Sequence, residues 1–376
     1  MKTLLKIVLK SALLFFVSSS TYTLHAQTTY SITDLGVVSG KTSSVATGLN
    51  DHGQVVGYSS GGTGGSLGFV WDSVNGISAL QGLRVVSADS NRATGINNAG
   101  QIVGWSARDS GNEHGILWEP GGGSVDLGDL PGGNDFSFGR AINQSGQITG
   151  NSVSLAGMRA YRWDSVNGMA DVVGDFPGGS SETIGRGINN LGHIVGNSGA
   201  STGPRAYLWD EINGMTNLGD LAGGDDYSFA HGVNDLDQVV GFSKIASGDR
   251  AFVWDSVNGM VDLGFVGNST EASRANDINN AGTVVGRLLG NQGAFVWDHG
   301  IGMTDLTTLL DSSGSGWDLQ DATAINEMGQ IVGWGINPQG QGRAFLLTPN
   351  SVPEPSSAML LVLGAGTIAL IRRRRK

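Results

Sequence analysis

Three short connecting segments of this 376-residue chain each place acidic residues a few positions ahead of a basic or titratable residue. The segments are residues 129–135, 175–179 and 220–226. Carboxylates beside cations at the mouth of a cavity suit a polyol or an anionic glycan. We therefore predict a ligand site made of Arg140, Arg186, His231, Asp135, Asp225 and Asp226. The alternative is that local salt bridges tie the connectors to the strand that follows.

The three basic positions share one place in a sequence repeat, because each lies three residues before an asparagine. That asparagine belongs to the phrase Ile/Leu/Val-Asn-x-x-Gly, which returns at intervals of 47, 46, 46, 45, 45 and 47 residues. The asparagines are Asn50, Asn97, Asn143, Asn189, Asn234, Asn279 and Asn326. A fixed period of this size is typical of a repeat array, in which units too short to bury a core alone stack on their neighbours.

One repeat, residues 140–174, predicts four short strands. Its apolar and aromatic runs have the length of strands, and Gly or Asn-Gly bounds them, which favours antiparallel hairpins. No sustained helical period appears between Gln27 and Asn350. Four antiparallel strands in a unit of about 40–50 residues are typical of a β-propeller blade.

The two ends of the repeat region predict that the propeller is a closed ring. A fourth-strand motif occurs seven times, but its first copy, near Asp34, precedes every other strand. The last repeat stops at Leu347 and lacks this strand. The sequence therefore predicts an all-β, seven-bladed propeller over residues 27–349, in which the strand at 30–36 completes the last blade.

A tryptophan recurs in the predicted third strand of six repeats. We interpret these residues as packing between blades rather than as a ladder for sugars, because large aromatic side chains bury much area and these occupy equivalent places. They are Trp71, Trp118, Trp163, Trp209, Trp254 and Trp297. The hairpins at one end of the blades are short and uniform, whereas the connectors at the other end vary. This contrast places the predicted ligand site on the connector face.

Residues 1–26 have the pattern of a secretory signal peptide. Three lysines precede the apolar run 12–17, and Leu24-His25-Ala26 gives a plausible cleavage site. The mature chain is therefore expected to be exported.

The C-terminal residues 350–376 combine Pro353-Glu354-Pro355, sixteen uncharged residues at 356–371 and five basic residues. As a helix the uncharged stretch would span about 24 Å, slightly less than a hydrocarbon core of about 30 Å, and the basic end predicts a cytoplasmic location. The tail resembles the PEP-CTERM sorting signal. This resemblance implies processing by an exosortase near Pro353, Glu354 and Pro355, transient anchoring in the inner membrane, and a Gram-negative, exopolysaccharide-producing host.

The repeats resemble the HAF family of extracellular repeat proteins. The family's His-Ala-Phe position is occupied by residues 159–161, 205–207, 250–252, 293–295 and 343–345, and none of these copies keeps the histidine. The resemblance covers residues 30–347 and implies no established activity.

Composition excludes several classes of function. The chain has no cysteine, so disulfides and thiol catalysis are excluded. Without the three lysines of the leader and the five basic residues of the tail, 14 basic residues stand against 33 acidic ones, a net charge near −19. This charge argues against nucleic acid as a partner. It leaves calcium as a possible ligand, although no EF-hand spacing is present, and no cofactor is predicted.

Matches to catalytic motifs are weak. The run 36–42 has one residue too few for a phosphate loop, and Gly57-x-Ser59-x-Gly61 belongs to a Gly-x-Ser feature of the repeat. We therefore predict a non-catalytic binding or structural module, sorted to the cell surface and acting in an exopolysaccharide or biofilm matrix. The alternatives are a glycan lyase or hydrolase on a propeller scaffold and a scaffold bridged purely by cations.

Overall fold

The computed structural model describes residues 28–84, 90–267, 272–290 and 293–350, and Thr29–Ser351 forms one compact unit. The predicted signal peptide and nearly all of the predicted sorting segment lie outside the described residues. In the part that is described, no helix has the length and apolar character needed to cross a membrane. The predicted span at 356–371 is among the residues not described.

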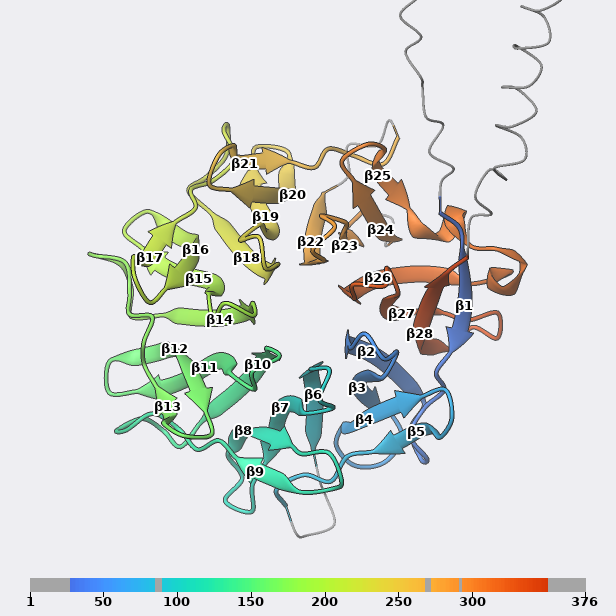
Figure 1. Ribbon diagram of the computed structural model, residues 1–376, viewed down its shortest axis with the longest axis horizontal. Helices are drawn as coiled ribbons and strands as arrows, with labels where there is room; N and C mark the ends of the chain where they lie inside the picture. The colour runs from blue at the N-terminus through green and yellow to red at the C-terminus, as the bar shows by residue number, and fades with distance from the viewer. Residues whose placement is uncertain (1–27, 85–89, 268–271, 291–292, 351–376) are drawn as a thin grey trace, which may run out of the picture. The chain divides into compact units, whose positions relative to one another are not determined.

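The described residues form twenty-eight strands in seven four-stranded antiparallel sheets arranged around a centre (Figure 1), which confirms the seven-bladed propeller. Blade 1 contains β2 (Ser43–Leu49), β3 (Val55–Ser60), β4 (Leu67–Asp72) and β5 (Gly76–Ala79). Blade 2 contains β6 (Asn91–Ile96), β7 (Ile102–Ala107), β8 (Glu113–Trp118) and β9 (Ser124–Asp126). Blade 3 contains β10 (Ser137–Ile142), β11 (Ile148–Ser154), β12 (Gly157–Asp164) and β13 (Gly168–Ala170).

The next three blades repeat this order from the innermost strand outwards. Blade 4 contains β14 (Thr183–Ile188), β15 (Ile194–Ala200), β16 (Gly203–Asp210) and β17 (Gly214–Asn217). Blade 5 contains β18 (Ser228–Val233), β19 (Val239–Ile245), β20 (Gly248–Asp255) and β21 (Gly259–Asp262). Blade 6 contains β22 (Ser273–Ile278), β23 (Val284–Leu288), β24 (Gly293–Asp298) and β25 (Gly302–Asp305). Two 3-10 turns follow it, η1 (Leu306–Leu309) and η2 (Ser312–Gly314).

Blade 7 joins the two ends of the repeat region. Its strands β26 (Asp318–Ile325), β27 (Ile331–Ile336) and β28 (Gly342–Pro349) come from the C-terminal end, and β1 (Tyr30–Asp34) is the fourth. The register of β1 on β28 runs from Tyr30 opposite Pro349 to Asp34 opposite Phe345. Figure 1 shows the blue β1 along the edge of the red β28. The predicted closure by an N-terminal strand is therefore confirmed.

Seven clusters of buried apolar residues fill the seven interfaces between neighbouring blades, and one of them joins blade 7 to blade 1. Each cluster contains one fully buried side chain two residues before the tryptophan position. These residues are Phe69, Ile116, Tyr161, Tyr207, Phe252, Phe295 and Phe345. The tryptophans pack beside them, from buried Trp118 to half-buried Trp71. Their predicted role in packing between blades is confirmed.

The repeated asparagines connect the blades at the end of the propeller that carries the hairpins, which we call the hairpin face. The side-chain amide of Asn50 donates to the carbonyl of Asn97, at 3.1 Å, and the pattern continues from blade to blade. It ends when Asn326 donates to Asn50, so the seven side chains form a closed ring of hydrogen bonds. Each asparagine also accepts backbone N–H bonds within its own turn. The phrase is therefore structural, as its repetition predicts.

One copy of the phrase differs, because Asp237 stands where the others have glycine. The six glycines at this position have positive φ, and Asp237 adopts the same conformation at φ 57. Aspartate tolerates this left-handed region better than most residues. Its carboxylate also accepts from Asn189 and contacts His193, so it adds to the bonding between blades 4 and 5.

Candidate ligand site in the central channel

A β-bulge in each innermost strand sends one side chain towards the central channel. The register of every first-to-second strand pair shifts at the residue three before the repeated asparagine. A bulge carries one residue more than its partner strand and re-aims that residue's side chain. The seven bulge residues are Thr47, Thr94, Arg140, Arg186, His231, Asn276 and Thr323, and all of them line one cavity of about 230 Å³.

Five of the seven bulge side chains bind the next blade. Each donates a hydrogen bond to the backbone carbonyl at the equivalent place in the neighbouring innermost strand. The pairs are Thr47 to Ala93 at 2.9 Å, Thr94 to Gly139 at 3.0 Å, His231 to Ala275 at 2.9 Å, Asn276 to Ala322 at 2.8 Å and Thr323 to Ala46 at 2.8 Å. The ordinary role of the bulge residue is therefore to hold two blades together.

Arg140 and Arg186 depart from this role. The Nε of Arg140 donates to Asn151 at 2.8 Å, and the Nε of Arg186 donates to Asn197 at 3.1 Å, so each arginine is held within its own blade. Among the described residues, neither guanidinium is paired with a carboxylate, and neither Nη group donates to a protein atom. The predicted alternative, salt bridges from the connectors to these arginines, is not what the described residues form.

The channel is positively charged on the side of blades 3 and 4, which carry Arg140 and Arg186. Burial, followed by the charge of Arg140, lowers the pKa of Arg186 to about 10. Burial also lowers the pKa of Arg140. For His231, burial and then the charge of Arg186 lower the pKa to about 3, so its ring is neutral at neutral pH. With Nδ1 donating to Ala275, Nε2 of that ring remains an acceptor.

Aromatic rings accompany the arginines towards the connector face. Arg186 lies 5.6 Å from the centre of the Phe229 ring, which stacks on Phe242 with centroids 5.1 Å apart. Arg186, Asn197 and Phe229 also line a hollow of about 340 Å³ beside the channel. Between blades 1 and 2, Arg92 of β6 lies 4.1 Å from the ring centre of Tyr58 of β3. The arginine side chains are thus positioned by both hydrogen bonds and ring contacts.

The predicted acidic partners lie elsewhere and do not join the arginines in one site. Asp135 contacts Arg108 at 2.8 Å and His114 at 2.9 Å. Asp226 pairs with Arg205 at 2.5 Å, and Asp225 with Lys244 at 2.8 Å. These cations come from the second and third strands and the loop between them, not from the innermost strand. The structure therefore separates the six predicted residues into a channel group and a connector group.

A histidine that the sequence comparison of repeats missed lies in the connector group. Register places His114 opposite Ser106, as Arg159 is opposite Ser152 and Arg205 opposite Ser198. His114 therefore occupies the position of Arg159 and Arg205 in the second repeat, a copy that the comparison of residues 159–161, 205–207, 250–252, 293–295 and 343–345 did not include. The neighbouring residues here are Gly115 and Ile116, which hid the match. His114 lies four residues before Trp118, as Arg159 lies four residues before Trp163. Aligning the repeats on their tryptophans would therefore have identified this histidine.

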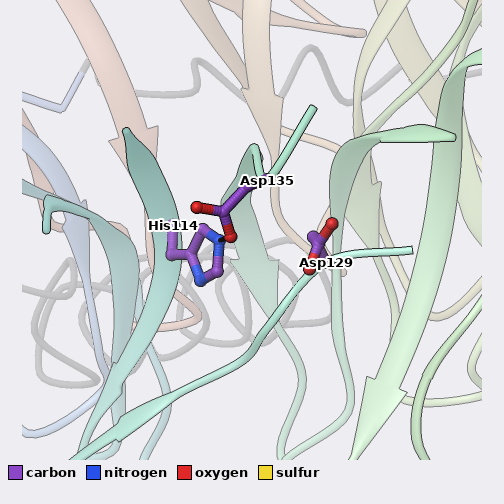
Figure 2. A group of neighbouring side chains, drawn as sticks. All are labelled: His114, Asp129 and Asp135. Carbon is purple, nitrogen blue, oxygen red and sulfur yellow. Dashed lines mark hydrogen bonds and ion pairs between the residues drawn. The ribbon is translucent and has the colours of Figure 1, made fainter. Parts of the chain in front are cut away.

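His114, Asp129 and Asp135 (Figure 2) are the one group of three or more potential metal ligands within the described ranges, with ligand atoms inside 4.8 Å of one another. Both ring nitrogens of His114 are already occupied, Nδ1 by Asp126 at 2.7 Å and Nε2 by Asp135. An Arg108 Nη1 lies 3.2 Å from that same Nε2. A guanidinium at this place competes with a metal ion, so the contacts fit a salt-bridge cluster better than a calcium site.

The pKa shifts of His114 and Asp126 agree with that interpretation. Burial opposes the charged ring, but the hydrogen bond and charge of Asp126 outweigh it and raise the pKa of His114. The pKa of Asp126 is lowered because its bond to His114 outweighs burial. Both shifts are those expected of a histidine hydrogen-bonded to carboxylates in a salt-bridge cluster.

Two further carboxylates near the channel carry no sequence signal. Asp277 occupies a place that is Gly or Ala in the other blades, and its oxygens accept from the backbone N–H of Ile278 and Ile325. Burial raises the pKa of Asp277 to about 7. Asp321 accepts from Asn276, and burial raises its pKa to about 6. These groups brace blades 6 and 7.

Comparison with known proteins bears mainly on the tail. Residues 351–376 match the family model of the PEP-CTERM protein-sorting motif. The predicted sorting signal is therefore confirmed, and the motif implies export and processing by an exosortase. No curated protein sequence matches the chain. Membership of the repeats in the HAF family stays a prediction.

Several solved structures are similar to the chain at low identity. Virginiamycin B lyase from Staphylococcus aureus is 9% identical, with a TM-score of 0.45 over 86% of this chain and 99% of that one. The lectin BP39L from Burkholderia pseudomallei is 11% identical, with a TM-score of 0.42 over 83% and 99%. A gluconolactonase from Xanthomonas campestris is 13% identical, with a TM-score of 0.36 over 67% and 83%. These values are too low to transfer any property to this chain.

Proposed function

We propose that this exported propeller is a non-catalytic binding module of the extracellular matrix and that it holds an exopolysaccharide at the connector end of its central channel. The observation that carries the proposal is the pair of Arg–Asn units, Arg140–Asn151 and Arg186–Asn197, confined to two adjacent blades. The asparagine ring, which supports the fold, recurs in every blade. The Arg–Asn units occur in two blades, and their arginines do not form the hydrogen bond to the next blade that other bulge residues form. This difference supports a role in binding.

The surrounding contacts support binding of a sugar polymer. Glycans offer hydroxyl groups to polar side chains and apolar ring faces to aromatic ones, and variable loops on a rigid scaffold commonly carry such sites. The hollow next to Arg186 offers Phe229 for contact and the carboxylate of Glu182 as an acceptor. Export by a sorting signal brings the protein to the compartment where such polymers occur.

A glycan lyase or hydrolase is the second candidate, and Asp277 is the observation in its favour. This carboxyl lines the same cavity as Arg140 and Arg186, and burial raises its pKa to about 7, near the value suited to a general base. Both of its oxygens accept backbone N–H bonds, however. A group so engaged is better suited to bracing two strands than to abstracting a proton, so binding is the function we favour.

Incubation of the secreted protein with matrix polysaccharide from its host tests the proposal. We expect the protein to sediment with the polymer and the polymer to keep its length and composition. Absence of co-sedimentation would refute the binding role. Release of reducing ends or unsaturated sugars would replace it with the enzymatic alternative, in which case Asp277→Asn should abolish the release.

A further inference from the structure

The geometry points to a more specific ligand: Arg140 and Arg186 together bind one acidic group on a sugar, a uronic acid carboxylate or a sulfate ester, while the sugar ring rests in the hollow beside Phe229. This inference rests on the proposed function, because it specifies which polysaccharides that site accepts. Three observations support it. The two guanidiniums lie close together, acidic residues border the hairpin end of the channel, and a hollow lies beside Arg186.

The two guanidiniums lack a counter-ion in the described protein. Arg140 and Arg186 lie on adjacent innermost strands, close enough that the charge of one lowers the pKa of the other. Like charges brought together in a half-buried channel repel each other, and an anion between them removes that cost. Their partners Asn151 and Asn197 hold Nε and leave Nη1 and Nη2 to a ligand. Guanidinium groups bind carboxylates and related oxyanions in this forked manner.

Charge also sets the direction from which an anion enters. The hairpin end of the channel is bordered by a second closed ring of hydrogen bonds, formed by the residue after each repeated asparagine. Three of those seven residues are acidic, namely Asp51, Asp235 and Glu327. They repel an anion at that end, so it reaches the arginines from the connector face.

The cavity at the arginines has room for a small group rather than for a polymer. Its volume is about 230 Å³, and seven bulge residues surround it. The hollow that Arg186 shares with it has about 340 Å³ and is lined by Phe229, Pro204 and Ile184 as well as by Glu182. Apolar ring faces of a sugar suit Phe229, and sugar hydroxyls suit the Glu182 carboxylate. The acidic group therefore enters the channel while its sugar stays outside it.

Calorimetric titration of the secreted protein with three hexasaccharides tests this assignment. One is a hexauronate, the second is the same chain after reduction of its carboxylates to alcohols, and the third carries sulfate esters. We expect binding of the hexauronate or the sulfated chain and at least a tenfold weaker binding of the reduced one. Whichever acidic chain binds more tightly identifies the source of the acidic group.

Three variants locate the bound group. Arg140→Gln and Arg186→Gln should each weaken binding of the acidic hexasaccharide about tenfold or more, because each removes charge-assisted hydrogen bonds. Arg162→Gln is the control, since it removes the same charge at a residue paired with Glu211 outside the channel. It should leave binding unchanged.

Stability separates binding from a structural role. Replacing Arg186 by glutamine in the ligand-free protein removes a repulsive charge, so its melting temperature should stay the same or rise. A fall in melting temperature with binding unchanged would overturn the inference and make these arginines structural. Equal binding of reduced and acidic chains would overturn the inference while keeping the proposed function. If neither matrix polysaccharide nor any of the three hexasaccharides binds, both this inference and the proposed function are wrong.

Discussion

At the scale of single residues, one backbone position performs two tasks in this propeller. The bulge residue of the innermost strand donates to the next blade when it is Thr47, Thr94 or Thr323. At Arg140 and Arg186 the same position holds a guanidinium that donates to an asparagine of its own blade. Because the register shift is the same in both cases, the side chain decides whether this position bonds to the next blade or within its own blade.

This comparison predicts that the structural role can be restored. In Arg186→Thr, the hydroxyl should donate to the carbonyl of Ala230, the place equivalent to Ala93. We expect a gain of about 1 kcal/mol in the free energy of unfolding from the new hydrogen bond, with loss of binding to acidic sugars. Urea denaturation measures the first and calorimetry the second. Thr94→Val, which removes such a bond, is the matched control and should lose about as much; a less stable Arg186→Thr would contradict the idea.

His114 predicts a pH dependence of stability. Its pKa is raised in the folded protein, so its interaction with Asp126 and Asp135 stabilises the fold fully below the unfolded pKa of about 6.5. The stabilisation is lost as the pH rises through the folded pKa. The difference in melting temperature between the protein and His114→Gln should therefore be larger at pH 5.5 than at pH 8.5. A difference that does not change with pH would mean that the ring is neutral in the fold.

The sequence identified Arg140, Arg186 and His231 as unusual positions but gave them the wrong neighbours. Asp135 is only five residues before Arg140, yet it pairs with Arg108 and His114. Alternation of side chains along a strand, broken by a bulge, sends residues this close in sequence to different surfaces. The register shift that decides this is a tertiary feature, and no residue type announces it.

At the scale of strands and turns, the sequence predicted nearly everything that recurs. Seven asparagine turns, seven groups of strands and the half-blades at the ends are repeated, so each copy supports the others. Asp277 and Asp321 could not be predicted, because each interrupts a repeat once and its burial comes from the blade packed against it. Repeated features of the scaffold can therefore be predicted from the sequence, whereas substitutions that occur in a single repeat cannot.

The asparagine ring predicts a large effect from a small change. Asn97 is fully buried, donates to Gln101 and Asn143, and accepts from two backbone N–H groups. Asn97→Ala leaves these partners without bonds, so we expect a loss of about 2–4 kcal/mol in the free energy of unfolding. Urea denaturation of this variant beside Asn98→Ala, a less buried member of the outer ring, measures it. Equal, small effects would show that the inner ring adds little.

At the scale of the whole propeller, closure depends on one strand. Within the described residues β1 pairs with β28 in the sheet of blade 7, and Tyr30 also forms a bridge with Leu310. Residues 30–35 contribute the buried side chains of Tyr30 and Leu35. Deleting residues 27–36 should leave β28 as an open edge, lower the melting temperature and promote aggregation. Scattering and thermal denaturation detect both effects. If the shortened chain melts like the complete one, the ring does not need this strand.

The sorting tail predicts what happens to the chain after export. Residues 351–376 match the PEP-CTERM motif, and Arg372–Lys376 form its basic end. If an exosortase processes the protein near Pro353-Glu354-Pro355, mass spectrometry of the surface protein should find no peptide from residues 372–376. Replacing these three residues by alanine removes the recognised motif, so the tail should then remain and the protein should stay with the membrane fraction. Removal of five positive charges also leaves the processed form more acidic. An intact tail on the wild-type surface protein would contradict processing and leave the propeller tethered.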